Sequence, residues 1–70
     1  MNVEIFKTDV VKKNQAEKIL LILNNHFPHF KINFDLDDCD KILRVEGERI
    51  AVEKIIALLH QQKILCEQLS

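Results

Sequence analysis

Two stretches in the middle of the chain alternate between apolar and polar residues. In residues 30–35, the sequence Phe-Lys-Ile-Asn-Phe-Asp places every second side chain on the same side. Residues 41–46, Lys-Ile-Leu-Arg-Val-Glu, repeat the pattern from Leu43 onward. A period of two predicts strands with one buried and one wet face. The connecting residues 36–40 are mostly aspartate, which bonds readily to its own backbone in turns. We therefore expect an antiparallel β-hairpin.

Segments with helical spacing flank this hairpin, at residues 14–27 and about 49–61. Their apolar residues recur at intervals of three and four, which predicts one buried face on each helix. These faces comprise Ala16, Ile19, Leu20, Leu23 and Phe27 in the first helix, and Val52, Ile55, Ile56 and Leu59 in the second. We expect Asn14 to be the N-cap of the first helix, with Glu17 as its capping-box partner, and Pro28 to limit its far end.

A short apolar run lies outside each helix, and we expect strands at residues 3–7 and 64–69, the second at a sheet edge. In the first, Val3 and Ile5 share one face while Phe6 lies on the other, so its register stays open. The order β-α-β-β-α-β with right-handed crossovers puts both helices on one face of a four-stranded antiparallel sheet. This is the α+β ferredoxin-like sandwich. The alternative, a two-helix bundle with loose hairpins, would leave the alternating strands unpaired.

The composition and net charge of the chain argue against several classes of function. Seventy residues, 47% hydrophobic and 30% charged, predict one ordered domain over residues 1–70. The net charge is −1 and the basic residues are scattered, so we expect no nucleic-acid partner. No run approaches the ~20 apolar residues of a membrane helix, so we expect no membrane partner. We predict a cytoplasmic protein in which Cys39 and Cys66 are reduced thiols.

The residues with chemical potential form no complete catalytic or metal motif. The acidic segment 35–40 lacks the glycine and the distal glutamate of a calcium loop, which indicates a solvated hairpin end. His26 and His29 could chelate a divalent metal, although a histidine also sits favourably at a helix C-terminus. Cys39 and Cys66 have no histidine or carboxylate at metal-site spacing. We therefore expect no enzyme activity, no cofactor and no tight metal binding.

The loop between the first strand and the first helix is a candidate for contact with a partner. Residues 8–13 place Lys12 and Lys13 near a helix N-terminus, where an anion could dock, although paired lysines are also common as solvated charge. We consider Val10, Val11, Lys12 and Lys13 as a candidate interaction loop.

Residues 6–10 (Phe-Lys-Thr-Asp-Val), 40–47 (Asp-Lys-Ile-Leu-Arg-Val-Glu-Gly) and the pattern from Val52 through Cys66 resemble a heavy-metal-associated domain over nearly the whole chain. The family includes copper chaperones and the N-terminal modules of copper- and zinc-transporting ATPases. The resemblance implies a ferredoxin-like fold and a first loop reading Met-x-Cys-x-x-Cys, whose two thiolates bind a soft metal.

The metal motif of that family is missing here. Val10 falls at its methionine, Lys12 and Gln15 fall at its two cysteines, and Lys63 falls near a glycine that usually precedes the last strand. An ammonium has no lone pair and an amide is a weak ligand for a soft ion. The resemblance therefore implies the scaffold of the family without its metal ligands.

Three functions from different classes follow as hypotheses. The first is a non-enzymatic binding module that pairs with a protein, or with itself, through an exposed strand edge or the first loop. The second is metal handling, like that of copper or zinc chaperones, with Cys39, Cys66, His26 or His29 as rearranged ligands. The third is a small ferredoxin-like enzyme, but its first loop would need an arginine to hold phosphate, and there is none.

Overall fold

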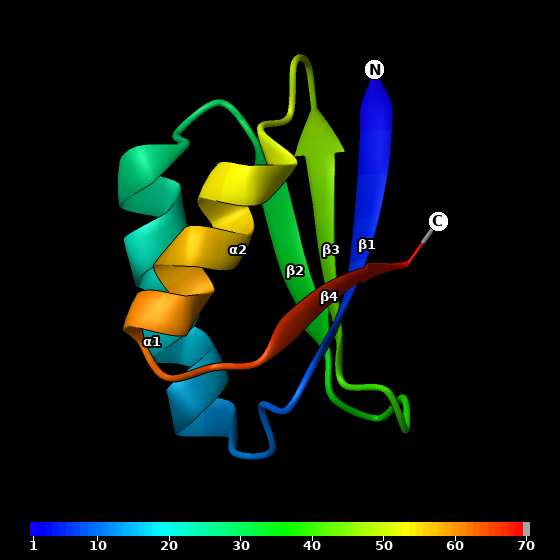
Figure 1. The fold of residues 1–70 in the computed structure, drawn as a ribbon, viewed down its shortest axis with the longest axis vertical. Coiled ribbons are helices and arrows are strands. Elements are labelled where there is room, and N and C mark those ends of the chain that lie inside the picture. Colours follow the sequence, from blue (N-terminus) through cyan, green and yellow to red (C-terminus); the bar gives the residue numbers. More distant parts are fainter. Residues whose placement is uncertain (70) are drawn as a thin grey trace.

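The computed structural model describes residues 1–69 and contains the predicted elements in the predicted order. They are β1 (Asn2–Thr8), α1 (Lys13–His26), β2 (Lys31–Asp35), β3 (Ile42–Gly47), α2 (Val52–Gln61) and β4 (Cys66–Leu69). The strands form one antiparallel sheet in the order β2-β3-β1-β4, and both helices cover the same face of it (Figure 1). The α+β ferredoxin-like prediction is confirmed, and the two-helix bundle with loose hairpins is wrong because all four strands are paired.

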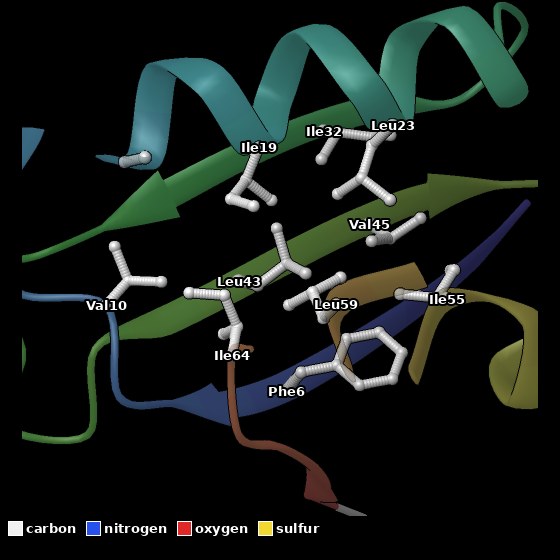
Figure 2. Close-up of a cluster of buried hydrophobic side chains, with 11 residues drawn as sticks. Phe6, Val10, Ile19, Leu23, Ile32, Leu43, Val45, Ile55, Leu59 and Ile64 are labelled. Carbon is white, nitrogen blue, oxygen red and sulfur yellow. The ribbon is translucent and has the colours of Figure 1, made fainter. Parts of the chain in front are cut away.

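The core lies between the sheet and the two helices. Figure 2 shows Ile19 and Leu23 of α1 pointing toward the sheet, where Leu43 and Val45 of β3 meet them. Phe6 is completely buried in the same layer, which settles the register of β1. The other fully or nearly fully buried apolar residues are Val10, Ala16, Ile32, Ile55, Leu59 and Ile64. Because β1 places Phe6 inward, alternation places Val3 and Ile5 on the open face of the sheet.

The start of α1 differs from the prediction. The N-cap is Lys12, whose carbonyl accepts the first helical hydrogen bond from the Ala16 N–H at 3.1 Å, so Asn14 lies inside the helix and caps nothing. The predicted capping box of Asn14 and Glu17 is therefore wrong. Instead, the Gln15 side chain reaches back, and its Oε1 accepts a hydrogen bond from the Val11 N–H at 3.3 Å.

The other boundaries shift by a few residues for backbone reasons. Arg49 takes φ = 55°, outside the helical region, so α2 begins at Val52 rather than near residue 49. After α2, the Ile64 N–H donates to the Leu59 carbonyl at 2.9 Å, and this closing turn delays β4 to Cys66. Within residues 1–69, no helix has the length and apolar character that crossing a lipid bilayer requires.

Candidate interaction surface

Three loops meet at one end of the sheet, the lower end in Figure 1, and Thr8 joins two of them. Its N–H donates to the Asp40 carbonyl at 3.1 Å, and its buried hydroxyl donates to the Lys41 carbonyl at 2.6 Å. The third loop is tied in by Asp9, whose Oδ1 accepts the Leu65 N–H at 3.0 Å. The β1–α1 loop, the β2–β3 hairpin and the α2–β4 turn are therefore fixed to one another.

The candidate interaction loop lies at this end, but only part of it is accessible. Val10 is completely buried and belongs to the core, so it cannot contact a partner. Val11 is 64% exposed, and Lys12 and Lys13 are exposed as well. Gln15 is half-buried with its side-chain oxygen already accepting a hydrogen bond. The loop therefore presents one apolar and two cationic side chains on a fixed backbone.

The acidic hairpin tip brings three potential ligand groups together. One ligand atom each from Asp38, Cys39 and Asp40 lie within 4.8 Å of one another. The two carboxylates already have structural roles, however. Asp38 Oδ1 accepts the Asp40 N–H at 2.8 Å, which closes the turn, and an oxygen of Asp40 lies 3.8 Å from Lys7 Nζ. The tip therefore has the contacts of a solvated turn.

The remaining candidate ligands are held in ordinary structural settings. His26 is the last residue of α1, and its Nδ1 donates to the Ile22 carbonyl at 3.0 Å, as suits a histidine at a helix C-terminus. Cys66 is half-buried, and burial raises the pKa of its thiol to about 11. At neutral pH this thiol is protonated, and a protonated thiol is neither a strong metal ligand nor a nucleophile.

The two outer strands, β2 and β4, leave backbone groups without a strand partner. The Thr8 N–H points to the β3 side of β1, and backbone groups of successive strand residues point to opposite neighbours. The residue pairs of β1 with β3, and of β3 with β2, extend this alternation to β2. They direct the N–H and C=O groups of Ile32 and Phe34 away from β3, toward the outer edge of β2. No backbone–backbone hydrogen bond within residues 1–69 satisfies them there.

A hollow of about 650 Å³ opens beside the outer edge of β2, between that strand and α1. Its apolar lining comes from Ala16, Leu20, Phe34 and Leu36, and its polar lining from Lys13, Glu17, Asn33, Asp35 and Asp37. Leu20, Phe34 and Leu36 are each half-buried and packed against the core, and their exposed parts offer apolar surface to the hollow. The edge of β2 thus combines free main-chain groups with an adjoining open hollow whose lining is partly apolar.

The edge of β4 has a different character. The same alternation directs the main chain of Cys66 and Gln68 outward, and their side chains share the helix-side face with Thr8 and Phe6. On that face Cys66 packs against the core, and the Gln68 side chain is engaged, donating to Glu4 Oε1 at 2.6 Å. A smaller hollow of about 310 Å³ lies beside β4, with Thr8, His60, Leu65 and Cys66 in its lining. With four residues, β4 is a shorter edge than β2.

The sequence patterns predicted only part of the candidate surface at the edge of β2. The expectation of an edge at the last strand is confirmed, but the expected elements did not single out Leu20, Phe34 and Leu36 as a lining. The topology itself could have found them, since the ferredoxin-like order also leaves the first hairpin strand at an edge. No model of a known protein family matches this chain, and no curated protein gives a significant sequence match to it.

Proposed function

We propose that this protein is a non-enzymatic interaction module that binds an extended segment of a protein partner along the outer edge of β2. The observation that supports this function is that β2 has an uncovered outer edge and that a partly apolar hollow lies beside that edge. Five consecutive residues of β2 pair with β3 without a bulge, and β2 contains no proline. A further strand can therefore pair with β2 if its own charges complement Lys31 and Asp35.

Recognition would proceed by strand addition. The N–H and C=O groups of Ile32 and Phe34 would supply the main-chain hydrogen bonds, which give affinity independent of sequence. Alternate side chains of the bound segment would enter the hollow against Leu20 and Phe34, and that contact would give specificity. The charged residues around the hollow would select the polar side chains that flank the apolar ones.

The proposal includes a scaffold similar to the heavy-metal-associated domain, without its metal function. Two features support the likeness. Val10, at the family's methionine position, is buried in the core, and Lys63, near the family's glycine position, has φ = 62°, a left-handed conformation that favours glycine. Lys12 and Gln15 replace the ligands, so the proposed function includes no metal and no catalytic step. Free cysteines at positions 39 and 66 support a cytoplasmic setting.

A matched pair of variants at one position tests this function. Phe34→Pro and Phe34→Ala both lose the aromatic ring, but only the proline loses the outward N–H, and a proline is tolerated at the free edge of a sheet. Peptides from a displayed random library would first be selected on the unmodified protein. Their affinities for the three proteins would then be measured by fluorescence polarisation, with far-ultraviolet circular dichroism to verify folding.

We expect the selected peptides to contain alternating apolar residues, to bind Phe34→Ala more weakly than the unmodified protein, and to lose binding to Phe34→Pro. Gln68→Pro, which removes an outward N–H from β4 instead, should leave binding unchanged. Peptides that bind all four proteins equally would place recognition elsewhere. A selection that enriches no peptide would argue against strand addition altogether.

A further inference from the structure

The sequence of β2 is complementary to itself when read in the opposite direction. Lys31 begins the strand and Asp35 ends it, with Ile32 and Phe34 on either side of Asn33. In an antiparallel pair of two such strands centred on Asn33, each Lys31 lies opposite Asp35 of the second copy, and each Ile32 lies opposite Phe34 of the second copy. Opposite charges and apolar pairs that face each other directly across strands stabilise the pairing.

The backbone geometry agrees with this centre. Because the free N–H and C=O groups belong to Ile32 and Phe34, an Ile32–Phe34 pair across the junction exchanges both of its hydrogen bonds. Both charged residues lie on the open face of the sheet, in water, so pairing them incurs no burial of charge. Two other registers, centred on Ile32 or on Phe34, would keep the hydrogen-bonding pattern of the junction. Neither of them places Lys31 opposite Asp35. Charge complementarity therefore selects one register.

The side chains beside the edge add apolar surface to the same junction. Phe34 and Leu20 are half-buried in the hollow next to the free edge. Leu21 of α1 is 69% exposed and follows Glu17, another lining residue, by four positions, so it extends the same side of the helix. A second copy joined along β2 would bring its own α1 toward these residues.

We infer that the partner bound along the edge of β2 is a second copy of this chain, joined antiparallel about Asn33, so that the two sheets continue as one. This inference rests on the proposed use of the β2 edge and names its occupant. The assembly has two-fold symmetry, and each copy contributes the same surface.

Charge-exchange variants test the register. In the dimer, Asp35→Lys sets a lysine opposite each Lys31, and Lys31→Asp sets an aspartate opposite each Asp35. Both positions are exposed, so folding should be retained. In a mixture of the two variants, however, mixed dimers can form, and only these remove the like-charge pairs across the junction.

 One strand of such a mixed dimer carries two lysines and the other carries two aspartates, so every charged pair across the junction is again opposite in sign.

Sedimentation velocity from micromolar to millimolar concentration would give the dissociation constants. Lys54→Asp, on the exposed side of α2, serves as a control for net charge. We expect each single variant to dimerise at least about tenfold more weakly than the unmodified chain, and the mixture to recover the affinity of the unmodified chain. The control variant should dimerise like the unmodified chain. Slower hydrogen exchange at the Ile32 and Phe34 amides with rising concentration would identify the surface.

An unmodified chain that stays monomeric at millimolar concentration overturns the inference, as does a mixture that associates no better than its components. If the peptides selected on β2 still bind such a monomer, strand addition stands and only self-pairing fails. If the chain is monomeric and no peptide binds at β2, both proposals fail together.

Discussion

The ring of Phe30 lies so close to Gly47 that a Cβ placed on the glycine would overlap Phe30 Cδ1 and lie 3.0 Å from Cε1 and 3.2 Å from Cγ. The glycine does not have a positive φ, so space is what requires it. The ring cannot easily move aside, because its other neighbour is Phe27, stacked on it with centroids 5.2 Å apart. The end of β3 and the turn before β2 are therefore fitted to each other through these aromatic contacts.

Gly47→Ala should lower the free energy of unfolding by about 1 to 3 kcal/mol, because the added methyl group overlaps the Phe30 ring. The measurement is urea denaturation of this variant, of Phe30→Ala and of the double variant. In the Phe30→Ala background the same change should lower stability by less than about 0.5 kcal/mol, since the obstacle is gone. Equal losses in both backgrounds would mean that the ring is not the cause.

Thr8→Val should destabilise the protein by about 1 to 3 kcal/mol although valine has nearly the same shape. The substitution removes the hydroxyl that donates to the Lys41 carbonyl at 2.6 Å and accepts the Val10 N–H at 3.3 Å, leaving both backbone groups without that partner. Thr8→Ser, which keeps the hydroxyl, should retain most of the stability that valine loses. If thermal unfolding shows valine and serine to be equivalent, the hydroxyl does not hold the loops together.

Lys12→Cys combined with Gln15→Cys should create a copper(I) site, whereas we expect the unmodified chain not to bind copper(I) tightly. Position 12 is the N-cap of α1 and position 15 lies in its first turn, where the helix dipole lowers a thiol pKa. Competition with a chromophoric copper(I) chelator measures the transfer. Lys12→Ser with Gln15→Ser removes the same side chains without adding thiols, and should take up no metal. If the unmodified chain strips the chelator stoichiometrically and Cys66→Ser abolishes this, the metal-handling alternative is right.

The half-buried thiol of Cys66 should make stability fall as the solution becomes alkaline. Its pKa rises from 9.0 to about 11 in the folded protein because burial disfavours the thiolate. Between those values the folded chain holds a proton that the unfolded chain has released, so the free energy of unfolding decreases as pH rises through this window. Denaturant titrations of the unmodified protein and of Cys66→Ala, compared from about pH 8 to about pH 11, should diverge there. Parallel curves would contradict the shift.

The fold was accessible from sequence because the two helices and the two hairpin strands each carry their own period. Alternation around Ile32 and Leu43 depends only on which side of an element faces the core, and that pattern is local. The helix starts were not accessible in the same way. Asn14 has the side chain of a good N-cap, but the chain enters α1 two residues earlier, because Val10 must first reach the core and Gln15 then bonds back to Val11.

The candidate surface was harder to predict than the fold, because it depends on contacts between distant segments. Leu20 and Phe34 both look like core residues by period, and only the packing of α1 against β2 leaves them half-buried beside a hollow. The loop at Val10 shows the reverse case. Its position in the chain suggested exposure, while its side chain is completely buried.

The central place of β1 has a consequence for synthesis on the ribosome. Its neighbour β4 is far away along the chain, as the contact between Glu4 and Gln68, 64 positions apart, shows. At about 5 to 20 residues per second, β1 is made about 3 to 13 s before the strand that covers its second edge. The β2–β3 hairpin joins neighbouring segments and can form early. Phe6 of β1, in contrast, stays exposed until the segments that pack against it have been synthesised. Chaperones and proteases should therefore meet this nascent chain first at β1.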